Sequence, residues 1–183
     1  MKSITVALAG NPNSGKTSVF NMLTGAHQHV GNYPGVTVEK KEGHCTHRDW
    51  RITFVDLPGT YSLTAYSAEE LIARNHIQED QPDVVVDVVD ASNLERNLYL
   101  ATQIMEMDVP MVLAFNMSDL AERRGLKFDL DQLSRLLEMR IVPTVGNKSL
   151  GRTELLDAIV ETASAHRKER VHRLTYGQEI EDE

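Results

Sequence analysis

The residues with the clearest chemical potential form one run near the start of the chain. Residues 10–17 read Gly-Asn-Pro-Asn-Ser-Gly-Lys-Thr, which matches the phosphate-loop pattern G-x-x-x-x-G-K-S/T without a mismatch. An apolar, β-branched run at 4–9 precedes it, and residues 18–24 follow with helical spacing and stop at Gly25. A strand, a glycine-rich turn and a helix N-terminus aim backbone N–H groups and positive charge at one point, which predicts a phosphate cradle.

Each residue of this loop is expected to contact the phosphates of a nucleotide. Lys16 would reach the β- and γ-phosphates, and the Thr17 hydroxyl would ligate Mg²⁺. The full set of expected contacts is Gly10, Asn11, Pro12, Asn13, Ser14, Gly15, Lys16, Thr17 and Ser18. A glycine-rich turn that matches by accident is the alternative, and the flanking strand and helix patterns argue against it.

Further motifs follow predicted strands. Asp56-Leu57-Pro58-Gly59 would hold Mg²⁺ through water with its carboxylate, and the Gly59 N–H would contact a γ-phosphate. In Asn116-Met117-Ser118-Asp119, the Asp119 carboxylate can accept from both N1–H and the exocyclic amine of guanine, which adenine cannot supply. Asn116 would tie this segment to the phosphate loop, although an Asx turn after a strand is the alternative.

The segment Val145-Gly146-Asn147 carries a weaker signal. It follows the last predicted strand, so it either offers backbone N–H groups to the guanine oxygen or is an ordinary turn. Because the carboxyl ends of parallel strands share one edge of a sheet, all four segments are expected to meet there.

The elements that must position these segments alternate between strand and helix patterns. This alternation predicts an α/β fold in which a mostly parallel sheet is covered on both faces. Residues 26–36 and 57–65 are expected to be loops, and residues 44–50 a polar hairpin turn. Strands are predicted at 4–9, 37–43, 51–56, 83–90, 110–115 and 141–145, and helices at 18–24, 67–76, 94–107, 129–139 and 153–165.

Composition limits the function classes. The 183 residues carry a net charge of −8 with 41% apolar content, which suits a soluble globular domain and argues against a nucleic-acid surface. Cys45 is the single cysteine, so no internal disulfide can form and a reducing compartment is expected. The sequence has no cationic, apolar leader and no apolar run long enough to span a bilayer.

Five segments together resemble the N-terminal G domain of the bacterial ferrous iron transport protein B family, over about residues 1–165. They are the runs at 10–17, 30–39, 55–63, 89–98 and 116–119, and they include loops outside the general nucleotide motifs. The resemblance implies a three-layer P-loop GTPase (Ras-like) fold with a sheet of about six or seven strands. It also implies that Thr37 binds Mg²⁺ in the GTP state and that Asn13 helps to hold K⁺ beside the phosphates, where K⁺ acts like an arginine finger.

Two departures from general GTPases bear on activity. Met117 stands where most of them have lysine, and the resembling family commonly has methionine there. Thr60 follows Gly59 in place of the glutamine that orients the attacking water in Ras-type enzymes. We therefore expect slow hydrolysis that depends on Mg²⁺, Lys16, backbone N–H groups and K⁺. The loop at 145–148 lacks the Ser-Ala sequence that GTPases usually have at this place, which predicts weak nucleotide retention.

Several other residues invite a metal-site interpretation. Imidazole and thiolate groups are competent Fe²⁺ ligands, but their one- or two-residue spacing on a hairpin places some on opposite faces, so solvated surface is the favoured interpretation. The residues concerned are His27, His29, His44, Cys45 and His47. The basic run at 166–173 is expected to be a solvated helix end or a membrane-proximal linker.

The resemblance sets the expectations for the whole protein. It implies a G domain at 1–166 and, at 167–183, a linker and the cut-off start of a small helical domain, with a polytopic membrane domain beyond. The parent would be a ferrous iron transporter, and this fragment would lie at the cytoplasmic face of the bacterial inner membrane. Expected partners are GTP or GDP, those following domains, small cytosolic accessory proteins and other copies of the chain, but no nucleic acid.

Two other functions remain open. A free-standing GTPase of ribosome assembly or tRNA modification has a similar phosphate loop, although the acidic charge opposes it. The second of these is a nucleotide-gated interaction module, in which bound nucleotide controls whether residues 27–40 and 59–75 are ordered or disordered.

Overall fold

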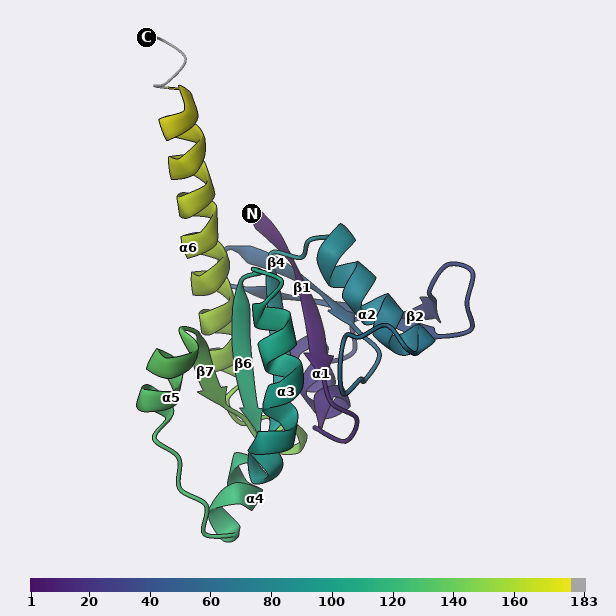
Figure 1. Ribbon diagram of the computed structural model, residues 1–183, viewed down its shortest axis with the longest axis vertical. Helices are drawn as coiled ribbons and strands as arrows, with labels where there is room; N and C mark the ends of the chain where they lie inside the picture. Colours follow the sequence, from purple (N-terminus) through teal and green to yellow (C-terminus); the bar gives the residue numbers. More distant parts are fainter. Residues whose placement is uncertain (179–183) are drawn as a thin grey trace.

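The computed structural model describes residues 1–178 as one α/β domain (Figure 1). Its seven-stranded sheet has the order β2-β3-β4-β1-β5-β6-β7. The strands are β1 (Lys2–Gly10), β2 (Gln28–Asn32), β3 (Glu39–His47), β4 (Trp50–Asp56), β5 (Val84–Asp90), β6 (Met111–Asn116) and β7 (Arg140–Pro143). All neighbours pair in parallel except β2 with β3 and β3 with β4. This confirms the expected mostly parallel sheet.

Helices cover both faces of this sheet. They are α1 (Lys16–Thr24), α2 (Ala68–Glu79), α3 (Leu94–Met105), α4 (Ser118–Arg123), α5 (Leu130–Leu137) and α6 (Arg152–Gln178), with short 3-10 helices η1 (Ala91–Asn93) and η2 (Gly146–Lys148). One core joins the sheet to α1 and α6, and the other joins it to α2 and α3. The central strands can be apolar on both sides because each face is buried, and β5 reads Val-Val-Val-Asp-Val-Val-Asp for this reason.

Three sequence-based assignments are wrong. The segment 26–36 is not wholly a loop, because β2 forms there as an exposed edge strand antiparallel to β3. The hairpin turn is at Arg48 and Asp49, not at 44–50, since β3 continues to His47 and pairs it with Trp50. The short helix α4 was not predicted. Both strand errors have a similar cause: β2 at the edge of the sheet is fully exposed and β3 beside it is only partly buried, so neither strand shows a clear apolar alternation.

The last helix runs further than expected. The predicted helix at 153–165 is α6, which continues through Gln178 and so includes most of the predicted linker, while residues 179–183 lie outside the described part. Figure 1 shows α6 continuing beyond the edge of the sheet near the N-terminus. Arg167 fixes it there, because its guanidinium donates to the Ser3 carbonyl at 2.9 Å and to Asp83 Oδ1 at 3.2 Å. Within residues 1–178, no helix has the length and apolar character to cross a bilayer.

Candidate nucleotide site

The phosphate loop lies between β1 and α1, as predicted. Its backbone needs left-handed conformations at Asn13, with φ of 66°, and at Gly15, with φ of 84°. A Cβ on Gly15 would lie 2.2 Å from the Asn116 amide nitrogen, so no larger residue fits. Glycine is therefore required at position 15 for two reasons: the backbone is left-handed there, and Asn116 leaves no room for a side chain.

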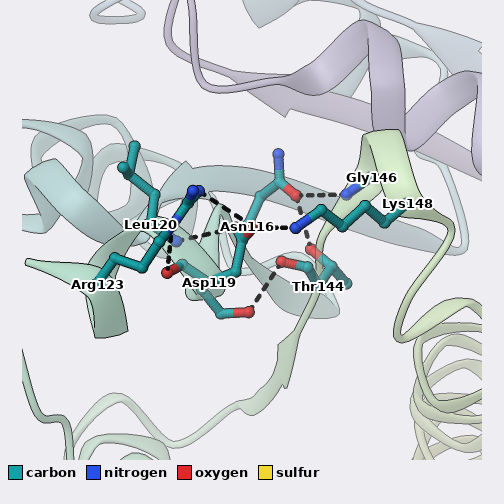
Figure 2. Close-up of polar contacts among 8 residues, drawn as sticks. Asn116, Asp119, Leu120, Arg123, Thr144, Gly146 and Lys148 are labelled. Carbon is teal, nitrogen blue, oxygen red and sulfur yellow. Dashed lines mark hydrogen bonds and ion pairs between the residues drawn. The ribbon is translucent and has the colours of Figure 1, made fainter.

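Asn116 joins three of the predicted segments at the carboxyl edge of the sheet. Its Nδ2 donates to the Ser14 carbonyl of the phosphate loop at 3.0 Å. Its Oδ1 accepts from the Gly146 N–H at 3.0 Å and from the Thr144 hydroxyl at 3.2 Å. Figure 2 shows the oxygen of this amide directed at Gly146 and Thr144. The predicted tie between Asn116 and the phosphate loop is thus present.

A cavity of about 230 Å³ opens beside this amide. Its lining brings together segments that are far apart in the sequence. The lining residues are Gly15, Ser18, Asn116, Met117, Asp119, Leu120, Arg123, Val145, Gly146 and Asn147. Met117 covers the phosphate loop, since its Cε would be 3.3 Å from a Cβ at Gly15. The position and lining of the cavity suit a planar base held beside the phosphate loop.

The Val145-Gly146-Asn147 segment lines this cavity, but two of its three backbone N–H groups are already hydrogen-bonded within the protein. The Gly146 N–H already donates to Asn116, and the Val145 N–H donates to the Leu150 carbonyl at 3.2 Å. These two N–H groups are therefore engaged within the protein, and the choice between a base contact and an ordinary turn stays a prediction. Within the described structure, Asn147 is left as the candidate donor of the three.

The Asp56 segment contacts the phosphate loop at two points. The Lys16 ammonium is paired with Asp56 Oδ1, and both side chains are about 10% exposed. Beyond Leu57 and Pro58, Gly59 lies against Pro12, and the Thr60 N–H donates to the Gly10 carbonyl at 3.2 Å. The lysine and carboxylate of the expected phosphate and Mg²⁺ site are therefore already side by side.

Thr37 is less closely integrated. It is exposed on a tight loop that is closed at its base, where the Tyr33 N–H donates to the Val38 carbonyl at 2.9 Å. In the described structure, no hydrogen bond joins Thr37 to Thr17 or Asp56. The Mg²⁺ ligand set expected from the sequence is thus only partly assembled.

Two anchoring residues were missed by the motif analysis. Tyr33 is buried, and its hydroxyl donates to the Asp56 carbonyl at 3.4 Å. The pKa of Tyr33 is raised, chiefly by burial and next by the negative charge of Asp56. Glu70 accepts from the Ser62 hydroxyl at 2.9 Å and from the Tyr66 N–H at 3.0 Å, and the Tyr66 hydrogen bond is the first cause of its lowered pKa. Glu70 also takes part in the helix cap, since its backbone N–H donates to Ser67 Oγ at 3.1 Å.

The histidine and cysteine residues do not gather into a metal site. Among the described residues, no group of three or more His, Cys, Asp or Glu side chains is arranged to hold a metal ion. His27 and His44 stack with ring centroids 5.1 Å apart, whereas Cys45 is buried on the opposite face of β3. His47 is instead paired with Asp157 of α6 at 2.6 Å.

The fold and these joined motifs define a protein of the P-loop GTPase class. A family model described as ferrous iron transport protein B matches residues 4–159. The chain belongs to this family, of which it contains the G domain.

Individual relatives agree with this assignment. The Fe(2+) transport protein A/Fe(2+) transporter FeoB fusion protein of Porphyromonas gingivalis is 52% identical over 97% of this chain and 21% of its own length. The solved FeoB G-domain from Methanococcus jannaschii is 46% identical, with a TM-score of 0.81 over 90% of this chain and 99% of that one. The cytosolic domain of the T. maritima FeoB iron transporter in its GMPPNP form is 46% identical, with a TM-score of 0.85 over 87% of this chain and 64% of that one.

Proposed function

We propose that this chain binds GTP and hydrolyses it slowly, as the nucleotide-dependent part of a ferrous iron transporter. The observation that carries the proposal is the Asn116 amide, which joins the phosphate loop, the Asp119 segment and the Gly146 turn. A cradle of backbone N–H groups at one end and a carboxylate at the other match the two ends of a guanine nucleotide. A GMPPNP form of the T. maritima relative supports the same ligand class.

Base selection is assigned to Asp119. Its two oxygens would accept N1–H and the exocyclic amine of guanine, while adenine presents an acceptor at the corresponding ring nitrogen. Met117 and the Val145-Gly146-Asn147 segment would form the walls around the base. The pKa of Asp119 is lowered, chiefly by a hydrogen bond from Lys148, so the carboxylate keeps its charge well below neutral pH.

The residues expected to hold Mg²⁺ fit that ion. Thr17, Asp56 and Thr37 offer hydroxyl and carboxylate oxygens, which are the hard ligands that Mg²⁺ prefers. Asp56 already neutralises a cation, the Lys16 ammonium, so its surroundings suit positive charge. When bound, Mg²⁺ would neutralise charge on the β- and γ-phosphate oxygens. Thr37 would join the set only after its exposed loop moves toward the phosphates.

Asn13 fits a role beside K⁺. It is exposed in a left-handed position of the phosphate loop, and its amide oxygen is a neutral, hard donor. A bound K⁺ would supply positive charge where other GTPases use an arginine finger. K⁺ stimulation of hydrolysis is therefore part of the proposal.

Four residues are proposed to promote hydrolysis: Lys16, Asn13, Thr37 and Gly59. Lys16 would neutralise phosphate charge directly, whereas Asn13 would act through K⁺ and Thr37 through Mg²⁺. Gly59 would donate its N–H to the γ-phosphate. Thr60 is buried, and its N–H is held by the Gly10 carbonyl, so this position does not offer a side chain to orient water. A slow intrinsic rate follows.

The function of the whole protein extends beyond this chain, which spans 21% of the P. gingivalis relative. We propose that residues 1–166 are the G domain and that 167–183 lead into a helical domain and then a membrane domain. Nucleotide turnover at the cytoplasmic face of the inner membrane would gate or drive Fe²⁺ uptake. Small cytosolic accessory proteins and other copies of the chain are the further proposed partners. Family membership favours this transporter role over a free-standing GTPase of tRNA or ribosome metabolism.

The test is hydrolysis of GTP and ATP measured side by side, with Mg²⁺, in potassium and in sodium buffers. We expect GTP to be hydrolysed in preference to ATP and faster in potassium, with Asn13→Ala removing the difference between the two salts. Equal rates with both nucleotides would overturn the base assignment. Equal GTP rates in both salts would overturn the role of Asn13.

A further inference from the structure

The carboxylate assigned to base recognition is already occupied in this structure. Asp119 Oδ1 accepts from the Leu120 N–H at 2.9 Å. Oδ2 accepts from the Lys148 ammonium at 2.6 Å and, at the longer distance of 3.4 Å, from the Arg123 guanidinium. Figure 2 shows both cations pointing at this one side chain.

Guanine binding requires a free acceptor position on each oxygen of Asp119. Each carboxylate oxygen has two acceptor positions. Oδ1 retains one after the Leu120 N–H is counted, whereas Oδ2 has both directed at cations. A guanine that donates N1–H to one oxygen and its amine hydrogen to the other therefore has to displace a cation from Oδ2.

Lys148 is the cation that reaches Asp119 from a different segment of the site. Arg123 comes from the same helix as Asp119, four residues further on. Lys148 comes from η2, which follows β7, so its ion pair links the two segments on either side of the base cavity. In Figure 2 its side chain extends from beside Gly146 toward Asp119.

We propose that Lys148 is an affinity-determining residue that competes with guanine for Asp119. This inference rests on the proposed GTP site and adds a regulatory residue to it. In this structure the Lys148 ammonium occupies an acceptor position of Asp119 that guanine needs. Nucleotide entry exchanges this ion pair for the two hydrogen bonds from guanine. The competition weakens nucleotide binding.

The expected size of the effect follows from the exposure of the pair. Lys148 is 54% exposed and Asp119 27%, so the ion pair is a surface interaction of modest strength. Lys148→Met keeps the length of the side chain and removes its charge. We expect this variant to bind GDP about two- to fivefold more tightly than the unaltered chain, mainly through faster association. Stopped-flow fluorescence with labelled GDP and Mg²⁺ would give both rate constants.

Three comparisons separate competition from a structural effect. The advantage of Lys148→Met should shrink at high ionic strength, because salt screens the exposed pair in the unaltered chain. Lys148→Arg, which keeps a cation at this position, should bind GDP much as the unaltered chain does. Lys127→Ala removes a lysine outside the cavity lining and should change GDP binding by less than about twofold, which controls for the loss of net charge.

A double-mutant cycle tests the partner directly. In an Asp119→Asn background, Lys148→Met should leave the affinity for xanthosine diphosphate unchanged, because the carboxylate that the lysine pairs with is gone. GDP affinity in Lys148→Met that is equal to or weaker than in the unaltered chain overturns the competition. Absence of GDP binding by the unaltered chain would instead overturn the proposed function itself.

Discussion

At the scale of single residues, the site depends on a few polar groups that serve two neighbours at once. The Asn116 amide bonds to the Ser14 carbonyl and to the Gly146 N–H, so it fixes the phosphate loop and the last loop together. Buried amides of this kind are costly to leave unpaired. Geometry at the phosphate end of the site is therefore coupled to geometry at the base end.

Base selection can be tested at Asp119. Asp119→Asn replaces one acceptor oxygen by an NH₂ donor, which matches the carbonyl of xanthine and opposes the amine of guanine. We expect affinity for GDP to fall by about tenfold or more, and affinity for xanthosine diphosphate to rise by a similar factor. Calorimetric titration with both nucleotides measures this exchange. Unchanged preference for GDP would contradict the assignment.

The phosphate loop can be tested at Gly15. Gly15→Ala places a methyl group 2.2 Å from the Asn116 amide nitrogen at a backbone φ of 84°. Both the contact and the backbone conformation oppose the change, so we expect a loss of about 2–4 kcal/mol in stability and no measurable GDP binding. Gly125→Ala is the matched control, because its φ is 75° but nothing lies within 4 Å of a Cβ there. The control should lose only the smaller backbone contribution and still bind GDP.

At the scale of elements, the hydrophobic periodicity of the sequence predicted the strands and helices whose side chains are buried. Buried strands such as β5 and β6 and the helices α2 and α5 were predicted because their apolar runs and spacing mark them locally, and Ser67 and Asp129 cap the two helices in the structure. The exposed strand β2 was missed because all five of its residues face solvent and leave no apolar pattern. The Lys148–Asp119 pair joins elements 29 residues apart in sequence, and no local spacing encodes it.

The loop that carries Thr37 is an element with a defined anchor. Tyr33 is buried at its base, with its hydroxyl on the Asp56 carbonyl and the Lys40 ammonium 5.7 Å from its ring centroid. The ring should therefore limit how far Thr37 can move from the phosphates. This arrangement connects the loop directly to the strand end that supplies Asp56.

Removing that anchor should affect hydrolysis more than binding. For Tyr33→Ala, we expect faster amide exchange across residues 30–40 and GTP hydrolysis slowed by about tenfold, because the Thr37 loop is no longer anchored to the strand end that supplies Asp56. GDP affinity should change by less than about twofold, since GDP lacks the γ-phosphate. Tyr33→Phe should lose only the long hydroxyl bond and remain close to the unaltered chain. Tyr99→Ala removes an exposed tyrosine of α3 and serves as the control.

At the scale of the whole molecule, the sheet separates two apolar cores, and one of them contains a carboxyl group. Asp87 lies in the centre of β5, between Ala9 of β1 and Leu113 of β6, and is 1% exposed. Neither of its oxygens has a hydrogen-bond partner among the described residues. Burial raises its pKa to about 7. A buried, uncompensated carboxylate opposes folding, so the global stability of the domain should depend on pH through this residue.

The direction of that dependence follows from proton binding. The unfolded chain releases the Asp87 proton near pH 4, whereas the folded chain keeps it up to about pH 7. The stability contribution is therefore fully present below pH 4 and is lost as the pH rises through 7. Asp87→Asn cannot ionise, so its free energy of unfolding relative to the unaltered chain should be higher at pH 8 than at pH 5, by up to about 3 kcal/mol. Urea denaturation at both pH values measures the difference. Asp90→Asn, on the same strand but partly exposed, is the control, and an equal difference in both variants would contradict the role of burial at Asp87.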